Sequence, residues 1–551
     1  MRGIDHPDEL QFSLKYLHPV SMLKGVQKAS RLLVAALEQQ QKILVIGDFD
    51  ADGATSSALA VRCLQAMGCQ QVDYLVPNRF EYGYGLTPEI VVEASKRKPH
   101  LIITVDNGIS SIKGVDKAKS LGISVVVTDH HLPAKKLPDA DAIVNPNQPG
   151  DNFPSKNLAG VGVVFYLMLA LKSRLQKTGY FTANNLAEPN LSKYLDLVAL
   201  GTVADVVTLD QNNRILVEQG LRRMRSGNAC AGIKALFQVA KRNINTAVSA
   251  DLGFACGPRL NAAGRLDDMS LGIECLLADD ESLALEYALA LDDLNTERRA
   301  IEENMRAEAI TLLQELDEHQ ISADLPPVIC LYKETWHQGV IGILAARIRE
   351  RYNRPSIVFA PAETGEKDVK EIKGSARSIP GIHIRDILDE VASTYPGLLE
   401  KFGGHAMAAG LTLERQRLDE FTQAICKITK KNSSKETFEE ICHSDGKLQA
   451  ADFDLKQAYE LRFAAPWGQN FPAPIFDNHF TIINKRIIRS RHLKLLLRPK
   501  GFERTVPAII FNAELDQWPA EGEVVHLLYR LEVNEYQGSY SLQLLIDKLL
   551  A

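Results

Sequence analysis

The first 150 residues alternate short β-branched runs with helical patterns, and this alternation limits the folds open to the chain. Helical stretches such as residues 54–67 and 88–98 separate the runs. The predicted strands cover residues 42–49, 72–77, 100–106, 124–129 and 141–146. Strands that alternate with helices favour βαβ units, in which a parallel sheet is covered on both faces. The sequence therefore predicts an N-terminal α/β domain with a parallel sheet.

Acidic and imidazole side chains gather where three of these predicted strands end. The stretch VIGDFDADGATSS, residues 45–57, places aspartates at every second position, and alternate residues of a strand share a face. VDNGIS and TDHH follow along the chain, and a further aspartate closes the apolar helical run VALGTVADVV. The set is Asp48, Asp50, Asp52, Asp106, Asp129, His130, His131 and Asp205. Because ligands of α/β sheets bind outside the carboxyl ends of the strands, we expect the strand-end residues to meet at one edge.

So many carboxylates at one edge favour a cation site over helix capping. One aspartate at a strand end usually caps the next helix, but several together repel one another unless cations lie between them. Oxygen and imidazole ligands without thiolates suit manganese or magnesium, and less firmly zinc or iron. Two such ions that share a carboxylate, about 3.5 to 4 Å apart, would activate a water and stabilise an in-line displacement at phosphorus.

The ordered motifs resemble those of a known enzyme family. DFDADG, VDNG, TDHH and GTVADVV are similar to the successive motifs of the DHH phosphoesterase superfamily. GPRLNAAGR (257–265), WHQGVIGI (336–343), GSARS (374–378) and FGGHAMAAG (402–410) resemble those of the RecJ family of bacterial single-stranded-DNA exonucleases. The resemblance extends from about residue 8 to the C-terminus.

The resemblance implies a set of metal ligands with Asp106 as the bridge between two divalent ions, Mn²⁺ or Mg²⁺. The implied ligands are Asp50, Asp52, Asp106, His130 and Asp205. His131 would lie beside the scissile phosphate, so Asp106, His130 and His131 are the predicted catalytic residues. Smaller hydrolases of the superfamily have a histidine four residues before the first metal aspartate, where this chain has Ile46. Asp48 either compensates as a sixth ligand or is a solvated acid outside the ligand set.

A long helix and a second α/β unit are predicted after the N-terminal domain. Residues 278–319 contain no Gly or Pro and are rich in Ala, Leu and Glu. Charges on most faces indicate a solvent-exposed connector, and a coiled coil is less favoured because no strict heptad is sustained. Residues 324–430 resemble the DHH-associated domain, which in this family faces the metal site across a cleft.

Several residues are predicted to bind a phosphate or the DNA backbone. The glycines of FGGHAMAAG would let backbone amides approach a phosphate, although they could equally serve close packing of a helix on a sheet. GSARS offers two hydroxyls and a guanidinium. The predicted residues are Arg79, Arg259, Arg265, Ser375, Arg377, Gly403, Gly404 and His405. For each arginine alone, an ordinary ion pair is an equally good interpretation.

The last 105 or so residues are predicted to form a small antiparallel β-barrel. Short strand-like segments between residues 480 and 549 are separated by polar turns, and the resemblance identifies the barrel as an OB fold. Although the formal net charge of the whole chain is −6, this region contains a stripe of basic residues. OB folds bind single strands through basic grooves of this kind. The stripe includes Lys485, Arg486, Arg489, Arg491, Lys494 and Arg498. Tyr529, Tyr536 and Tyr540 either stack on bases or belong to the barrel core.

The expected organisation is an N-terminal helical lead-in (1–40), a DHH catalytic domain (41–275), a connector helix (276–320), a DHH-associated domain (321–432) and an OB-fold domain (445–551). The eight cysteines form no C-x-x-C pair, which argues against zinc knuckles and a disulfide framework and favours a reducing cytoplasm. The apolar run GVGVVFYLMLAL is too short to span about 30 Å of hydrocarbon. The polar, acidic start MRGIDHPDEL does not resemble a signal peptide.

These features predict a metal-dependent exonuclease that degrades single-stranded DNA in the 5′ to 3′ direction to 5′-mononucleotides, in recombination and repair. The polarity, the product, a monomeric state and two partners, a single-stranded-DNA-binding protein and a helicase, follow from the resemblance alone. One alternative is a phosphodiesterase of the superfamily acting on short oligonucleotides or cyclic dinucleotides, which the basic barrel disfavours. Another is a catalytically inactive DNA-binding replication factor, which the filled ligand positions disfavour.

Overall fold

The computed structural model describes residues 2–77, 85–319, 325–362, 370–489, 491–513, 515–536 and 538–550. The chain divides into two compact units, which are described separately. The first contains residues 1–292 and 443–551, and the second contains residues 293–442.

The N-terminal part of the first unit is built on a parallel sheet, as predicted. Among the described residues, this sheet has the strand order β2-β1-β3-β4-β5, and every pair in it is parallel. The strands are β1 (Ile43–Gly47), β2 (Val72–Leu75), β3 (Leu101–Val105), β4 (Ser124–Thr128) and β5 (Ala142–Val144). All five residues of β1 and all five of β3 are buried, because helices cover both faces.

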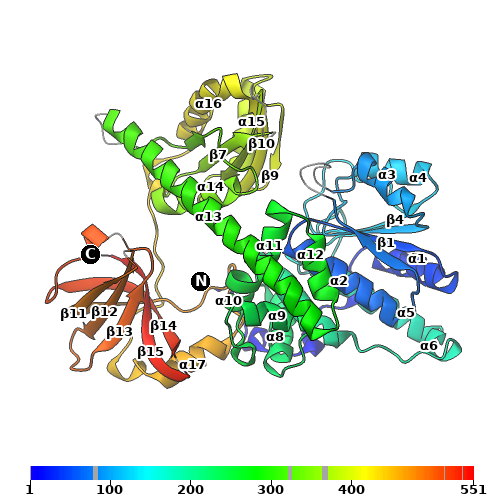
Figure 1. Cartoon of the computed structure of the whole chain (residues 1–551), viewed down its shortest axis with the longest axis horizontal. Helices are drawn as coiled ribbons and strands as arrows, with labels where there is room; N and C mark the ends of the chain where they lie inside the picture. The colour runs from blue at the N-terminus through cyan, green and yellow to red at the C-terminus, as the bar shows by residue number, and fades with distance from the viewer. Residues whose placement is uncertain are drawn as a thin grey trace. The chain divides into compact units, whose positions relative to one another are not determined.

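One face of this sheet carries α3 and α4, and the other carries α1, α2 and α5 (Figure 1). The bounds are α1 (Val26–Glu38), α2 (Ala51–Ala66), α3 (Pro88–Lys96), α4 (Ile112–Ser120) and α5 (Gly160–Lys177). Further helices complete the unit: α6 (Tyr180–Ala183), α7 (Leu195–Ala204), α8 (Gln211–Arg225), α9 (Ala231–Val239), α10 (Ser249–Asp251), α11 (Gly257–Leu266) and α12 (Ser270–Leu277). The largely buried α7 packs against α2, α5 and α8, so the aspartate that follows it lies near the sheet edge.

Helix α13 (Glu281–His319) confirms the predicted long helix, but its description as a solvent-exposed connector is incomplete. Met305, Ala309 and Leu313 are buried in a hydrophobic cluster with α14 (Ile341–Tyr352). The charges on most faces of α13 led to the prediction of an exposed helix, although this narrow apolar stripe is buried.

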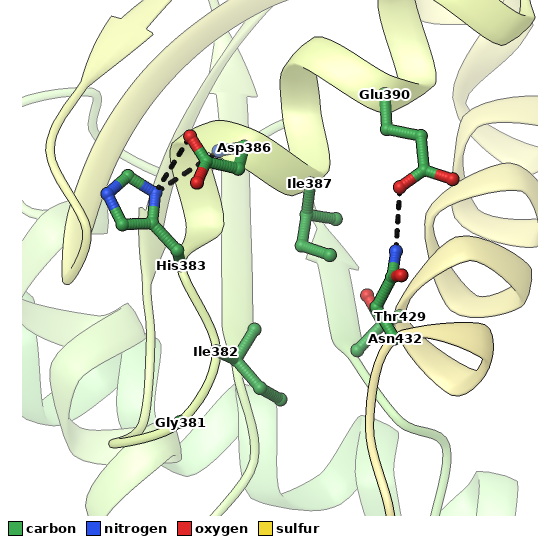
Figure 2. A pocket seen from close by; sticks show the side chains of 8 residues that line it. All are labelled: Gly381, Ile382, His383, Asp386, Ile387, Glu390, Thr429 and Asn432. Carbon is green, nitrogen blue, oxygen red and sulfur yellow. Dashed lines mark hydrogen bonds and ion pairs between the residues drawn. The ribbon is translucent and has the colours of Figure 1, made fainter.

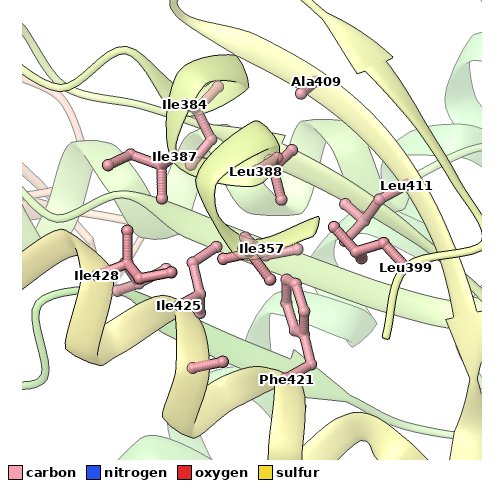
Figure 3. Close-up of a cluster of buried hydrophobic side chains, with 14 of the residues drawn as sticks. Ile357, Ile384, Ile387, Leu388, Leu399, Ala409, Leu411, Phe421, Ile425 and Ile428 are labelled. Atoms are coloured by element: carbon pink, nitrogen blue, oxygen red, sulfur yellow. The ribbon is translucent and has the colours of Figure 1, made fainter. Parts of the chain in front are cut away.

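The second unit is an α/β sandwich around a mixed sheet. Its described strands have the order β6-β7-β8-β10-β9, with β6 and β7 parallel and the other pairs antiparallel. The strands are β6 (Ile329–Tyr332), β7 (Ser356–Pro361), β8 (Glu371–Arg377), β9 (Lys401–Gly404) and β10 (Ala408–Glu414). Helices α15 (Ile384–Thr394) and α16 (Leu418–Lys431) bury their apolar sides against this sheet (Figure 3).

The C-terminal segment of the first unit forms a closed barrel of order β11-β12-β13-β15-β14 among the described strands. The strands are β11 (Phe476–Ile488), β12 (His492–Pro499), β13 (Val506–Ile510), β14 (Val524–Tyr536) and β15 (Ser539–Leu549). All pairs are antiparallel except β13 with β15, and α17 (Leu455–Ala464) packs against β14. None of the described helices combines the length and the apolar surface that a bilayer crossing requires.

Candidate metal centre and phosphate-binding residues

The turn after β1 fixes two aspartates with backbone hydrogen bonds. Asp50 is the N-cap of α2, and its Oδ1 accepts from the N–H groups of Asp52 (2.9 Å) and Gly53 (3.0 Å). Asp52 is 1% exposed, and its carboxylate accepts from the N–H groups of Gly160 (2.6 Å) and Val161 (2.9 Å) at the start of α5. Folding therefore orients these carboxylates before any ligand binds.

Asp106 follows β3 in a left-handed backbone conformation, with a φ of +62°, and is 2% exposed. A Cβ added to Gly160 would lie 2.6 Å from Asp106 Cβ. The absence of a side chain at Gly160 thus allows α5 to approach Asp106 and Asp52 together.

His130 joins residues from three parts of the fold. Its Nε2 lies 3.1 Å from Asp106 Oδ1 and 3.5 Å from Asp205 Oδ2. Among the described residues, neither His130 Nε2 nor Asp205 Oδ2 has a hydrogen-bond partner, although both atoms are buried. Burial, followed by the positive charge of His131, lowers the pKa of His130, so the imidazole is neutral as a metal ligand must be.

The carboxylates form two neighbouring groups that could each hold an ion. Ligand atoms of Asp52, His130 and Asp205 lie within 4.8 Å of one another, and so do those of Asp48, Asp50 and Asp106. A third such group, Asp106 with His130 and His131, overlaps both.

Burial and mutual repulsion make this cluster unfavourable without cations. Burial and then the charge of Asp205 raise the pKa of Asp52 to about 7. Burial and then the charge of Asp50 raise the pKa of Asp205 to about 8, and burial and then Asp52 raise that of Asp106. No described lysine or arginine forms an ion pair with Asp52 or Asp205. The donor set therefore fits hard divalent cations.

Asp129 positions His131, a role that the sequence did not reveal. Asp129 Oδ1 accepts from His131 Nδ1 at 2.7 Å, and its Oδ2 accepts from the N–H of Ile109 at 2.8 Å. Burial lowers the pKa of His131, but the hydrogen bond and charge of Asp129 outweigh it and raise that pKa to about 9. His131 is thus a protonated, partly exposed donor beside the acidic cluster. In the sequence, the only indication that Asp129 pairs with His131 is that both lie in the TDHH motif.

The predicted phosphate-binding residues of the second unit include a partly buried arginine. Arg377 Nη1 donates to Ser375 Oγ (3.1 Å) and to the Ala376 carbonyl (2.8 Å). Burial and then the charge of Arg349 lower the pKa of Arg377, and none of the ion pairs between described residues involves Arg377. A Cβ at Gly342 would lie 2.9 Å from Arg377 Nη2, so α14 lies directly against this guanidinium.

The glycine-rich motif forms the turn between β9 and β10. The N–H of His405 donates to the Ala408 carbonyl at 2.8 Å, and Gly404 has a φ of +144°. A Cβ at Gly403 would meet nothing within 4 Å in the described structure, so close packing does not explain that glycine.

The other predicted arginines differ in environment. Arg259 is 7% exposed and forms an ion pair with Asp292 (Nη2 to Oδ1, 2.7 Å), which favours the ion-pair interpretation for this residue. Arg265 lies in the last turn of α11 and is half-buried. Arg79 lies outside the described residues.

The barrel exposes most of its predicted basic stripe. Exposed members are Arg486, Arg489, Arg491, Lys494 and Arg498, and Arg486 faces Lys494 across β11 and β12. The Lys485 ammonium is engaged by the barrel itself, since it donates to the carbonyls of Trp518 (3.1 Å) and Pro519 (3.0 Å).

Aromatic residues of the barrel are divided between core and surface. Tyr529 is fully buried, and its hydroxyl donates to Asn478 Oδ1 at 2.7 Å, so it belongs to the core. Tyr540 is 40% exposed, and the Tyr536 side chain lies outside the described set. Sequence patterns did not identify Phe511, which is 55% exposed and meets the His492 ring edge-on at 5.3 Å.

The chain is similar to known proteins along its whole length. Residues 42–202 match the DHH family N-terminal domain, residues 325–431 match the DHHA1 domain, and residues 444–548 match the RecJ OB domain. The single-stranded-DNA-specific exonuclease RecJ of Escherichia coli is 50% identical over 549 residues, which cover 100% of this chain and 94% of that protein.

Two solved structures have the same fold. The crystal structure of RecJ in complex with Mn²⁺ from Thermus thermophilus has a TM-score of 0.80 at 29% identity, covering 100% of this chain and 74% of that one. The complex with Mg²⁺ from the same organism has a TM-score of 0.73 at 28% identity, covering 100% and 73%.

Proposed function

The chain belongs to the RecJ family of single-stranded-DNA-specific exonucleases, and we propose that it degrades single-stranded DNA from the 5′ end to 5′-mononucleotides. The observation that carries this proposal is the buried cluster of carboxylates around His130, which fits two divalent ions, Mn²⁺ or Mg²⁺. Five aspartates and a neutral imidazole provide oxygen-rich ligation of the kind such ions prefer.

The proposed ligands are Asp50, Asp52, Asp106, His130 and Asp205, with Asp106 as the shared carboxylate. When bound, two ions would activate the attacking water and stabilise negative charge at phosphorus. Asp48 is proposed as a further ligand, because it lies in one group with Asp50 and Asp106. The backbone N–H groups that hold Asp52 reduce the reorganisation that binding requires.

His131 is proposed to donate a hydrogen bond to an oxygen of the scissile phosphate. Its proton on Nδ1 is engaged by Asp129, so the other ring nitrogen is the one that a substrate oxygen would meet. A protonated imidazole donates a charge-assisted hydrogen bond, which is stronger than a neutral one.

Residues of the second unit are proposed to bind the 5′-terminal phosphate. Arg377 supports this proposal most directly, because it is a partly buried guanidinium with a serine hydroxyl at 3.1 Å and no ion pair within the described residues. Ser375, Gly403, Gly404 and His405 are proposed to contribute donors around it, and Arg79 and Arg265 to hold the strand. Arg259 remains a weaker proposal, because Asp292 already neutralises its charge.

Digestion of end-labelled single strands tests the activity and its polarity. We expect label at the 5′ end to appear first as a mononucleotide, only when Mn²⁺ or Mg²⁺ is present. Label at the 3′ end should remain on long fragments until late in the reaction. Early release of 3′ label would refute the polarity, and metal-independent cleavage would refute the metal assignment.

Two alanine variants test the ligand set. Asp106→Ala should abolish hydrolysis while leaving strand binding by the barrel largely intact. Asp48→Ala should lose comparable activity if Asp48 is a ligand, and far less if it is a solvated acid. Activity of Asp106→Ala near that of the wild type would contradict the two-ion assignment.

The closed, basic barrel supports a long-strand substrate over short oligonucleotides or cyclic dinucleotides. Every proposed ligand position is filled, which disfavours an inactive replication factor. The three family matches support the catalytic, DHH-associated and OB-fold parts of the proposed division, and the lead-in (1–40) and the connector helix (276–320) are proposed as separate parts from the sequence alone. All eight cysteines are free thiols, which supports a cytoplasmic location. A monomeric state and a single-stranded-DNA-binding protein and a helicase as partners are proposed from the family alone.

A further inference from the structure

Two strongly exposed apolar side chains of the first unit lie next to the metal centre, and neither belongs to the ligand set. Phe254 is 78% exposed, the largest exposed fraction of any large hydrophobic residue in the described chain, and Val206 is 62% exposed. Val206 directly follows Asp205, whose Oδ2 lies 3.5 Å from His130 Nε2. Single exposed apolar residues are common on protein surfaces, so a function requires evidence beyond exposure.

Val206 adopts a backbone conformation that valine rarely takes. Its φ is +59°, and it lies directly after the C-cap of α7, where a left-handed residue is usually glycine. Among the described residues, it is the only β-branched one with a positive φ, and a branched side chain is strained there. Its exposed side chain gains little from packing to offset this strain. Because strained residues cluster at functional sites, we infer that the valine side chain contacts a ligand.

Phe254 also lies in an unusual piece of backbone. It belongs to a π-helical segment, Leu252–Cys256, between α10 and α11. Leu252, Ala255 and Cys256 of this segment are buried, so the segment is anchored while the phenylalanine ring extends into solvent. Single π-helical turns frequently occur at functional sites.

The two exposed side chains come from segments that contact each other. The π-helical segment packs against α7, and a Cβ added to Gly253 would lie 3.3 Å from Val203 Cγ1. The N–H of Val206 donates to the carbonyl of the same Val203 at 3.2 Å. Phe254 and Val206 therefore both lie beside the last turn of α7, which ends at Asp205.

The cavity between α15 and α16 in the second unit differs from this surface, because its charged side chains are already paired. His383 Nδ1 lies 3.2 Å from Asp386 Oδ1, and Glu390 accepts from Asn432 at 2.7 Å (Figure 2). The apolar surface beside the metal centre has stronger evidence for a ligand.

The metal centre determines which ligand reaches the surface formed by Phe254 and Val206. If the ions hold the scissile phosphodiester, the two nucleotides that it joins lie beside Asp205. Every nucleobase has a π-face that stacks on an aromatic side chain with little regard to sequence. In a duplex this face is covered by the neighbouring base pairs, whereas a single strand can present it.

We propose that Phe254 and Val206 form a base-binding surface for one of the two nucleotides that flank the scissile phosphate. Phe254 stacks on the face of the base, and Val206 adds an apolar contact. The contact selects unpaired bases at the point of cleavage, independently of the barrel. This inference rests on the proposed function, because it places the phosphodiester at the metal centre.

Cleavage of 5′-phosphorylated single strands by the full chain with Mn²⁺ tests the proposal. One strand has normal bases, and two others carry a tetrahydrofuran abasic residue as the first or the second nucleotide. Phe254→Ala removes the ring, and Phe254→Tyr keeps it. Leu121→Ala is the matched control, since Leu121 is 45% exposed and lies between α4 and β4, at the sheet edge where β4 begins and not where it ends.

We expect Phe254→Ala to lower kcat/KM on the normal strand about tenfold or more, because one stacked base is lost. An abasic residue at one of the two positions should lower the wild-type value by a similar factor, and Phe254→Ala should cause no further loss on that strand. The position at which the two losses do not add identifies the bound base. Phe254→Tyr and Leu121→Ala should remain within about threefold of the wild type.

Val206→Asn adds a measurement that does not depend on catalysis. Asparagine tolerates the left-handed conformation and lacks the apolar contact. This variant should therefore melt no lower than the wild type, and it should lose more kcat/KM on the normal strand than on the abasic one. A lower melting temperature would show that Val206 stabilises the fold and would overturn its assignment to the base.

Three results would overturn the base contact while leaving the nuclease activity established. These are an unchanged kcat/KM in Phe254→Ala, losses that add at both abasic positions, and a loss in Phe254→Tyr equal to that in Phe254→Ala. If the wild type cleaves none of the strands with Mn²⁺, the proposed function is refuted and this inference with it.

Discussion

Gly160→Ala should inactivate the enzyme by displacing the acidic cluster. The added Cβ would lie 2.6 Å from Asp106 Cβ and 2.8 Å from its Oδ1. Carbon atoms in ordinary contact are about 3.5 to 4.0 Å apart, so the two segments must separate by about 1 Å. Neither segment yields easily, since Gly160 N–H is bonded to Asp52 at 2.6 Å and the residue after Asp106, Asn107, bonds the carbonyls of Ile46 and Val105.

A misplacement of about 1 Å at a reacting centre can reduce the rate by about 100-fold, whereas overpacking typically costs about 1 to 3 kcal/mol of folding free energy. We therefore expect Gly160→Ala to remain folded and to lose about two orders of magnitude in kcat on 5′-labelled strands at saturating Mn²⁺.

Gly162→Ala is the matched control, because its Cβ would approach only the end of the flexible Leu158 side chain, at 3.0 Å. This variant should keep wild-type activity. Activity of Gly160→Ala within threefold of the wild type, at an unchanged melting temperature, would refute the close approach of α5 to Asp106.

Three further predictions concern protonation, salt and metal. Protonated His131, with its pKa near 9, stabilises the fold below about pH 6.5, and this contribution is lost as the pH rises through 9. Asp129→Asn removes the partner that raises this pKa, so the alkaline limb of the kcat profile should move to lower pH. An unmoved limb would contradict the pairing of Asp129 with His131. Replacing Lys494 and Arg498 by glutamine should make the plot of log binding constant against log salt concentration for long strands less steep by about 1.4, because each phosphate that is no longer neutralised contributes about 0.7. An unchanged slope would remove both residues from the DNA interface. Mn²⁺ at 100 times its Kd should stabilise the wild type by about 2.7 kcal/mol in thermal unfolding, and most of this should vanish in Asp106→Ala; equal stabilisation would place the ions elsewhere.

The sequence predicted most of the catalytic fold because its signals are local. Buried β-branched runs and the turns that follow them depend on nearby residues, so the strands, their parallel direction and the acidic edge could be inferred. The order of the strands in the sheet was not predicted. The burial of Met305, Ala309 and Leu313 in α13 was not inferred, although their four-residue spacing is helical, because the many charged residues around them favour an exposed helix. Their burial depends on α14, which is distant in sequence.

The roles of individual side chains were harder to infer, because each depends on a partner far along the chain. In the sequence, Asp129 cannot be distinguished from the other acids of the cluster, and only its contact with His131 identifies its role. The sequence places Lys485 in a basic stripe, but its ammonium donates hydrogen bonds to carbonyls more than 30 residues away in the sequence. Arg259 could equally have faced DNA, and only the position of α13 supplies Asp292.

The carboxylates of the cluster combine structural and ligand roles. Asp50 caps α2 with one oxygen, and Asp52 holds the start of α5 with both. Each carboxylate oxygen can accept more than one hydrogen bond or ligand contact, so these bonds leave lone pairs for cations. The same bonds fix the orientation of the carboxylates during folding. The unfavourable free energy of bringing like charges together therefore lowers the stability of the fold and not the affinity for metal. That cost is visible in the raised pKa values of Asp52 and Asp205, and it is why a site this acidic gains free energy when divalent ions bind.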